Sequence, residues 1–313
     1  NPMTDTRMPA VAAVDWGTTR MRVWLLDSGG AVLGERRSDE GMLTAAGVGF
    51  AKVLERHLSE LAAPAKLPAI VCGMAGARQG WIEAPYAETP ATLGDVLAGA
   101  ISVPGVARDV RIIPGIAQKD VDAPDVMRGE ETQLAGIAAL RGPGDHLVCM
   151  PGTHSKWVAV KDGVVTGFGT WMTGELYSVI AKESVLKHSV GGGSLAFSPK
   201  SAAYAKAVKQ GLDDSASLTS RLFGIRAGGL LHKLASEDAA ATLSGLLIGA
   251  EIAGAQARYG TRGEVVLVGS GLMYDLYAVA LETAGLVSKQ ADADEAVRGG
   301  LFEAARRCEM VTG

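Results

Sequence analysis

The sequence predicts an α/β protein of two lobes, each built from one β-β-β-α-β-α-β unit. An apolar run, a Gly-Thr turn and a second apolar run occupy residues 11–26, and a weaker copy occupies 147–160. Superposing Gly17-Thr18 on Gly152-Thr153 needs no gap as far as the following turn. A chain of 313 residues is also long enough for two domains that each bury a core.

The first lobe shows the signals of three strands followed by alternating helices and strands. Ser28, Gly29 and Gly30 have the composition of a hairpin turn. Apolar residues at helical spacing between Val53 and Leu61 predict a helix. We expect strands at 11–15, 21–27, 31–38, 69–72 and 110–113, and helices at 48–61 and 94–101.

The best candidate for a domain boundary is the segment 116–127. It combines Pro124 with one lysine and several aspartates, which is typical of an exposed crossover. We therefore expect an N-terminal lobe at 1–124 and a C-terminal lobe at 125–313.

The second lobe repeats the three-strand pattern and then becomes helical. Its clearest helix is predicted for 236–259, with Ser236 as the N-cap and Gly260 just past the end. Residues 191–194 (Gly-Gly-Gly-Ser) predict a flexible break. We also expect a helix at 130–140, strands at 147–150, 156–160, 163–169 and 265–268, and a helix that follows Gly269-Ser270-Gly271 from about Leu272.

Composition narrows the classes of ligand. The net charge is −4 and no cluster of lysine or arginine forms a basic stripe, so we expect no nucleic-acid partner. The most apolar stretch, 243–255, is interrupted by Glu251 and is too short to span a membrane. Three widely spaced cysteines and no visible secretory signal predict a cytoplasmic protein. A small molecule is the expected ligand.

The two Gly-Thr turns predict a nucleotide site. Glycine lets a backbone approach a ligand closely, and the main-chain N–H groups and hydroxyls of such a turn can hold phosphates. Two turns that face one another would hold a nucleotide in a cleft. The alternative is that Asp15-Trp16-Gly17-Thr18 is an ordinary hairpin, because this pattern also occurs without a ligand. The sequence contains no Walker loop and no Rossmann fingerprint.

The order of these motifs resembles the superfamily of sugar kinases, heat-shock proteins and actin, and within it the 2-dehydro-3-deoxygalactonokinase family. The resemblance covers most of the chain. It rests on five segments, which are 15–20 (Asp-Trp-Gly-Thr-Thr-Arg), 72–81, 127–133, 151–157 and 172–176.

The resemblance implies two ribonuclease-H-like lobes, with ATP and Mg²⁺ in the cleft between them. It implies transfer of a phosphoryl group to the 6-hydroxyl of 2-dehydro-3-deoxy-D-galactonate. The expected nucleotide contacts come from the two hairpins and from a late turn that supports adenosine. These residues are Gly17, Thr18, Thr19, Gly152, Thr153, His154, Lys156, Gly269, Ser270 and Gly271.

Three carboxylates are candidates for the chemistry. Asp15 is the expected metal-side group, acting through a coordinated water, because it ends a strand beside the glycine turn. Glu130 is the candidate base, since related carbohydrate kinases carry their catalytic aspartate after a glycine at this place, and Glu131 is its neighbour. Acidic residues in a first helical turn also simply complement the helix dipole, so the assignment stays open.

A sugar acid requires a cation, and Arg20 and Arg78 follow glycine turns in the first lobe. Either arginine can instead be a surface residue. Trp81 is expected to line the sugar site or to lie in the core. The family resemblance adds four further candidates for substrate binding, which are Gly73, Met74, Thr173 and Glu175.

Two other functions compete with this one. The first is a kinase of the same superfamily for another small metabolite, such as a neutral sugar. The second is a nonenzymatic ATP switch that is recognised by a partner protein, although the chain has no long insert that would bind one. A homodimer is possible in either case.

Overall fold

The computed structural model describes residues 7–260 and 263–311. The chain divides into two compact units. Unit 1 contains the chain up to Asp145, the segment 160–167 and the C-terminal segment from Ala293. Unit 2 contains the segments 146–159 and 168–292.

Unit 1 is built on a six-stranded sheet with the order β3-β2-β1-β4-β8-β7. β1 pairs antiparallel with β2 and parallel with β4, so that Asp15 lies opposite both Arg22 and Cys72. The apolar runs of the sequence form these strands, and almost all of their side chains are buried. The strands are β1 (Val11–Trp16), β2 (Met21–Leu26), β3 (Val32–Ser38), β4 (Ala69–Gly73), β7 (Ile101–Ser102) and β8 (Val110–Ile112).

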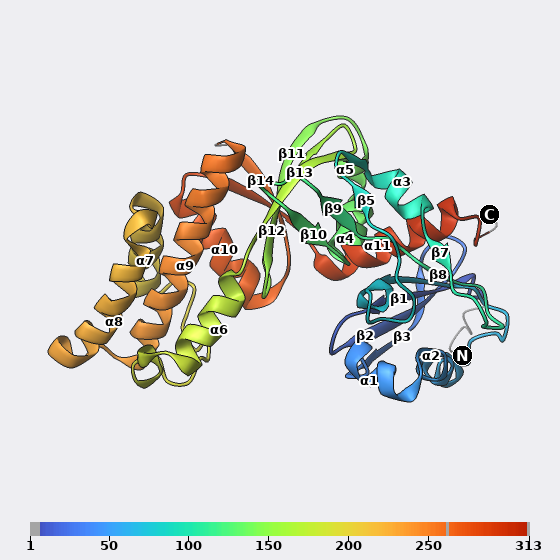
Figure 1. Ribbon diagram of the computed structural model, residues 1–313, viewed down its shortest axis with the longest axis horizontal. Coiled ribbons are helices and arrows are strands. Elements are labelled where there is room, and N and C mark those ends of the chain that lie inside the picture. Colours follow the sequence, from blue (N-terminus) through green and yellow to red (C-terminus); the bar gives the residue numbers. More distant parts are fainter. Residues whose placement is uncertain (1–6, 261–262, 312–313) are drawn as a thin grey trace, which may run out of the picture. The chain divides into compact units, whose positions relative to one another are not determined.

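Helices cover this sheet on both faces (Figure 1). α1 (Met42–Val48) and α2 (Phe50–Glu60) place Met42, Phe50 and Leu54 in one core with Ala12 and Val14 of β1. On the other face α11 (Ala293–Arg307) contacts β1, β4, α3 (Leu93–Ala98) and α4 (Glu130–Gly136).

A small sheet replaces most of the exposed crossover that was predicted for 116–127. β9 (Ile116–Gln118) pairs with β10 (Asp125–Met127) and with β5 (Ala87–Glu88), and the order is β10-β9-β5. Ile116 and Ala117 are buried. The prediction was wrong there because the pairing partner β5 lies far away in sequence. The connection between β9 and β10 is largely exposed, as is Val126 within β10.

Unit 2 repeats the strand order of unit 1. Its sheet contains the order β13-β12-β11-β14-β15, which is third, second, first, fourth and fifth in chain order, and β3-β2-β1-β4 of unit 1 follow the same order. This correspondence confirms the duplication that the sequence predicts. The strands are β11 (Asp145–Met150), β12 (Ser155–Lys161), β13 (Val164–Trp171), β14 (Glu264–Val268) and β15 (Val287–Ala291). The tip of the β12–β13 hairpin belongs to unit 1, where Val164 and Val165 pair with β6 (Ala91–Thr92).

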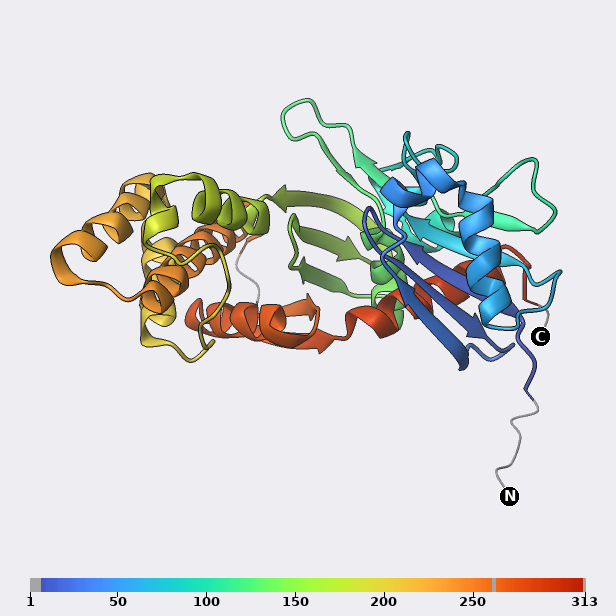
Figure 2. The ribbon, with the colours of Figure 1, turned by 90° about the horizontal axis from the view of Figure 1, so that it is seen from below.

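Helices form most of the rest of unit 2 (Figure 2). The buried α9 passes close to α7, where a Cβ atom at Gly249 would lie 2.3 Å from the Val208 carbonyl oxygen. The helices are α6 (Thr173–Glu183), α7 (Ala202–Asp213), α8 (Leu218–His232), α9 (Ser236–Tyr259) and α10 (Gly271–Thr283). Short elements complete the fold: α5 (Ala138–Arg141), η1 (Met74–Gly76), η2 (Val185–His188) and η3 (Ser215–Ser217). No helix in the described ranges is long and apolar enough to cross a membrane.

Several predicted helices differ in their ends. The helix expected at 48–61 begins at Phe50, and Gly49, with φ of +108°, separates it from the unpredicted α1. The helix expected at 130–140 is divided at Ile137, whose backbone is extended. α9 begins at Ser236, but Ala235 is its N-cap and no side chain caps it. Local propensity does not resolve such breaks, because packing decides where a helix turns.

The compact units do not follow the expected boundary between 124 and 125. α4 belongs to unit 1 because α11 packs against it at backbone distance. A Cβ atom at Gly300 would lie 1.9 Å from the Thr132 carbonyl oxygen, and one at Gly136 would lie 1.7 Å from that of Ala296. The C-terminal helix therefore completes the unit in which the chain begins, a contact that sequence order does not reveal.

Candidate functional site

The first Gly-Thr hairpin joins β1 to β2 and is held by the start of α1. The Gly17 N–H donates to the Arg20 carbonyl at 2.8 Å and closes the turn. The N–H groups of Met42 and Leu43 donate to the carbonyls of Gly17 and Thr18 at 2.8 and 3.1 Å. The carbonyl groups are thus occupied inside the protein, while the threonine side chains at the tip are exposed.

The second hairpin, between β11 and β12, is held in the same way by the start of α6. The Glu175 N–H donates to the Thr153 carbonyl at 3.0 Å. Gly174 lies so close that a Cβ atom there would be 2.6 Å from the Gly152 carbonyl oxygen. By contrast, a Cβ atom at Gly152 itself would meet nothing nearer than 3.8 Å, so the fold leaves space above this glycine. Neither Gly17 nor Gly152 has a positive φ.

Three segments that the sequence singled out meet at one edge of the sheet in unit 1. β1 and β4 are parallel, so their carboxyl ends carry Asp15 and Gly73 to the same place. Gly73 has φ of +93°, and a Cβ atom there would be 2.7 Å from the Trp16 carbonyl oxygen. A Cβ atom at Gly129, which precedes α4, would be 3.7 Å from the Gly73 Cα. The edge therefore brings Asp15 together with the residues that begin α4.

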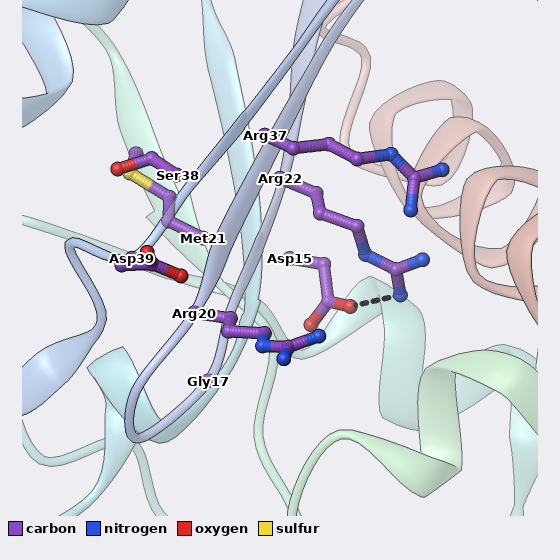
Figure 3. A pocket seen from close by; sticks show the side chains of 8 residues that line it. All are labelled: Asp15, Gly17, Arg20, Met21, Arg22, Arg37, Ser38 and Asp39. Carbon is purple, nitrogen blue, oxygen red and sulfur yellow. Dashed lines mark hydrogen bonds and ion pairs between the residues drawn. The ribbon is translucent and has the colours of Figure 1, made fainter.

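Asp15 is paired with an arginine that sequence reasoning missed. Arg22 Nη2 donates to Asp15 Oδ2 at 2.6 Å (Figure 3). Its Nη1 donates to Asp294 at the start of α11. Arg37 also donates to Asp294, at 2.9 Å. Burial lowers the pKa of Arg22, but the two carboxylates outweigh it and hold that pKa above its usual value. The predicted hairpin places Arg22 opposite Asp15, so strand register was a signal that could have found it.

Asp15, Arg22 and Arg37 line a cavity of about 460 Å³. Its walls also include Gly17 and Arg20, and Figure 3 shows the side chains of Asp15, Arg20 and Arg22 next to one another. Asp15 and Arg22 are both partly buried, with side chains 23% and 21% exposed. A cavity that combines two carboxylates, Asp15 and Asp39, with guanidinium groups can bind an anion beside a site for a cation.

The two glutamates at the start of α4 lie in different environments. Glu131 is fully buried, and it accepts hydrogen bonds from the Gly129 N–H at 2.5 Å and from Thr132 Oγ1 at 3.3 Å. Burial and the charge of Glu130 raise the pKa of Glu131 to about 8. Glu130 is only partly buried and accepts a hydrogen bond from the Arg128 N–H at 3.1 Å. At neutral pH, therefore, Glu131 is mainly protonated.

The two candidate arginines also differ. Arg20 lines the cavity beside Asp15. The Arg78 side chain is 85% exposed, and its Nε lies 3.6 Å from Oε1 of Glu83, which is exposed as well. The structure therefore brings Arg20, and not Arg78, to the cavity.

Trp81 and Met74 lie against the core of unit 1. The Trp81 ring stacks on Phe50 with centroids 5.9 Å apart and meets Trp16 edge-on at the same distance. These are the contacts expected of a tryptophan that packs against the core.

The remaining candidates belong to unit 2 and surround the second hairpin. His154 Nε2 and Glu175 Oε2 are 2.5 Å apart, and both side chains are exposed. Lys156 is buried, and its Nζ donates to Thr170 Oγ1 at 2.8 Å. Thr173 begins α6 and donates to the carboxylate of Glu251. Thr173 and Glu175 thus lie beside the second hairpin and belong to a different unit from Arg20.

The late glycine turn has the predicted form. β14 ends at Val268, and α10 begins at Gly271, whose φ is +67°. The Gly269 N–H donates to the Ala291 carbonyl at 3.0 Å, whereas Ser270 and Gly271 are exposed.

Sequence reasoning also missed the buried hydrogen bonds of Glu251, a residue that it treated only as an interruption of an apolar stretch. Its side chain is 1% exposed and accepts hydrogen bonds from Trp157 Nε1 at 2.8 Å and from the Tyr277 hydroxyl at 2.6 Å. A single acidic residue within an apolar helix was the available signal.

Comparison with known proteins agrees with this geometry. Residues 15–304 match the family described as 2-keto-3-deoxy-galactonokinase. A protein of Rhizobium meliloti (strain 1021), described as a probable 2-dehydro-3-deoxygalactonokinase, is 56% identical over 94% of this chain and 96% of its own length. The 2-dehydro-3-deoxygalactonokinase of Escherichia coli (strain K12) is 35% identical over 92% of this chain and 95% of its own.

Among solved structures, one match has high sequence identity and another has low identity but a similar fold. A crystal structure assigned to this enzyme in Sinorhizobium meliloti has a TM-score of 0.92 and 56% identity, and the match covers 95% of this chain and 98% of that one. An activator of 2-hydroxyisocaproyl-CoA dehydratase from Clostridium difficile, with bound ADPNP, has a TM-score of 0.52 and 14% identity, with 96% and 95% covered. The latter likeness concerns the fold alone.

Proposed function

Because the chain belongs to the 2-keto-3-deoxy-galactonokinase family, we propose that it transfers the γ-phosphoryl group of ATP to the 6-hydroxyl of 2-dehydro-3-deoxy-D-galactonate. The product is 2-dehydro-3-deoxy-6-phospho-D-galactonate. The observation that supports this most directly is the cavity of unit 1 where Asp15 and the first hairpin meet arginine side chains, at the sheet edge where Gly129, which precedes Glu130, packs near Gly73.

The two hairpins are suited to hold the phosphates. Their carbonyl groups are occupied by helix starts, which leaves the exposed threonine hydroxyls and the glycine backbone for a ligand. The turn at Gly269 is the proposed adenosine support. The hairpin at Gly17 belongs to unit 1, whereas the hairpin at Gly152 and the late turn belong to unit 2.

The residues present fit a magnesium ion that arrives with the nucleotide. Mg²⁺ keeps several waters and is usually bound through one or two carboxylates together with substrate phosphates. Asp15 supplies one such carboxylate at the cavity. Among the described residues there is no group of three or more histidine, cysteine, aspartate or glutamate side chains that could enclose a metal. When bound, the ion would neutralise charge on the transferred phosphoryl group.

Glu130 is the proposed base. A base must be ionised at the working pH and must reach the attacking hydroxyl. Glu131 meets neither condition, because its pKa is about 8 and it has no exposed surface. Asp15 is engaged by Arg22, which fixes its orientation. Glu130 follows Gly129, which packs near Gly73 at the same sheet edge, and it retains exposed surface, so it would accept the proton of the 6-hydroxyl as the phosphoryl group is transferred.

Arg20 is the proposed partner of the substrate carboxylate. Its guanidinium group lines the cavity, and a guanidinium fork matches a carboxylate in plane. Arg78 is a weaker candidate because it lies exposed beside Glu83.

A coupled assay of ADP release tests the proposal. The purified protein is given ATP, Mg²⁺ and a panel that contains 2-dehydro-3-deoxy-D-galactonate, related keto-deoxy acids and neutral sugars of similar size. We expect turnover with the galactonate derivative and little with neutral sugars. Equal use of a neutral sugar would contradict the substrate class, and no ADP release with any sugar acid would contradict the activity.

A further inference from the structure

A single buried carboxylate in unit 2 connects the segments that surround the second hairpin. Glu251 lies on α9, and it accepts hydrogen bonds from the side chains of Trp157, Thr173 and Tyr277, which belong to three other elements. Ser155 and Trp157 belong to β12, Thr173 is the first residue of α6, and Tyr277 belongs to α10.

The donors match what an ionised carboxylate can accept. Two carboxylate oxygens offer about four acceptor positions. Trp157 Nε1 occupies one of them at 2.8 Å and the Tyr277 hydroxyl another at 2.6 Å. The Ser155 hydroxyl also lies 2.8 Å from that of Tyr277, so these two side chains and the carboxylate form one continuous network.

This arrangement is costly if its only purpose is packing. Glu251, Ser155 and Trp157 are at most 1% exposed, and the surrounding core is apolar. Burial raises the pKa of Glu251, which shows that the interior opposes its charge. A buried ionic group of this kind often stabilises a fold less than an apolar replacement of similar volume, so a role in fixing geometry is the better explanation.

The contacts point to the hairpin as the part whose geometry is fixed. Ser155 directly follows the Gly152–His154 turn, and Thr173 directly precedes Gly174, which presses against the Gly152 carbonyl. Tyr277 lies on the helix that starts at the late glycine turn. One carboxylate thus connects three elements: the strand that leaves the proposed phosphate hairpin, the start of α6 beside that hairpin, and the helix that follows the proposed adenosine turn.

We propose that Glu251 is a positioning residue for the nucleotide, whose buried carboxylate holds the second hairpin and the start of α6 in the geometry that receives the phosphates. This inference rests on the proposed function, because it takes the hairpin at Gly152 as a phosphate site. It assigns a role in nucleotide binding to a side chain that the fold keeps away from solvent.

The test compares nucleotide and sugar binding in Glu251→Gln, which keeps the side-chain volume but replaces one acceptor oxygen by a donor. We expect the Kd for ADP with Mg²⁺ and the KM for ATP to rise about 10- to 100-fold. This is the range found when residues that orient the ligands of a metal are changed. The KM for the sugar acid should stay within about twofold, a split that general loss of stability would not produce.

Ile252→Val is the matched control. Ile252 is the next residue of α9, is fully buried and belongs to the same apolar core, but it has no polar group to offer the network. This variant should lower the Tm and leave the Kd for ADP unchanged. A rise equal to that of Glu251→Gln would overturn the inference, because any loosening of α9 would then suffice.

Two further variants keep the inference testable if Glu251→Gln does not fold. Thr173→Val and Tyr277→Phe each remove one donor, and each should raise the Kd for ADP. Combined with Glu251→Gln, either should add little, because side chains that act through one carboxylate are not additive. Wild-type affinity in folded Glu251→Gln, or in both single-donor variants, would overturn the inference. Failure of the wild-type protein to bind ADP would instead contradict the proposed function.

Discussion

At the scale of single residues, the two adjacent glutamates that begin α4 lie in different environments, because Glu131 is fully buried and Glu130 is only partly buried. Glu130 is the proposed base, so Glu130→Gln should lose about two to four orders of magnitude in kcat, the contribution of general-base catalysis. Binding of ADP and of the sugar acid should be unchanged, which calorimetry can check. A near-normal kcat would exclude Glu130 as the base and return the role to Glu131, to Asp15 or to the substrate itself.

Glu131 makes stability depend on pH. Its pKa is about 8 in the folded protein and near 4.5 in the unfolded chain, so the folded state binds the extra proton between these values. The free energy of unfolding should therefore fall as the pH rises, by about 1.4 kcal/mol per pH unit within this range. Glu131→Gln removes this pH dependence, because glutamine does not titrate. Urea unfolding at pH 5 and pH 8 should show the variant gaining on the wild type as pH rises, and a constant difference would contradict the buried protonated state.

Arg20 and Arg78 form a matched pair for testing substrate recognition. Arg20→Lys should raise the KM for the sugar acid about 10- to 100-fold, because lysine cannot form the paired hydrogen bonds of a guanidinium group. Arg78→Lys should behave as wild type, since Arg78 is exposed beside Glu83. Steady-state kinetics with both variants will decide. An effect at Arg78 alone would move the carboxylate site away from the cavity at Asp15.

At the scale of elements, both hairpins are supported by a helix start, and the space above the second is open. Gly152→Val should keep the fold, since a Cβ atom there meets nothing nearer than 3.8 Å. It should nevertheless abolish nucleotide binding by blocking the approach of phosphates to the backbone. Circular dichroism and ADP titration measure the two effects separately. Unchanged ADP affinity would remove the hairpin from the nucleotide site.

At the scale of the whole molecule, the C-terminal helix completes unit 1. Gly300→Ala should lower the free energy of unfolding by about 3 kcal/mol or more, because its Cβ atom would fall 1.9 Å from the Thr132 carbonyl oxygen. Gly224→Ala on α8 is the control, since a Cβ atom there meets nothing within 4 Å. That substitution should stabilise by about 0.5 to 1 kcal/mol. Thermal unfolding that gives the same shift for both would contradict the close packing of α11 on α4.

The sequence by itself determined the duplicated strand pattern, the Gly-Thr hairpins and the turn at Gly269. These features depend on local chemistry, because apolar alternation, glycine turns and strand ends are set by neighbouring residues. Asp15 and Gly73 could likewise be placed at one sheet edge, since parallel strands end together, whereas the approach of α4 to this edge could not.

Only the tertiary structure decided the partners that come from distant segments. The Arg22 link to Asp294, the pairing of 116–118 with β5 and the packing of α11 on α4 join parts of the chain that are far apart in sequence. The same is true of Glu251, whose hydrogen-bond network joins residues up to 122 positions apart, from Ser155 to Tyr277. Such contacts depend on complementary shape and burial, which one sequence read along its length does not contain.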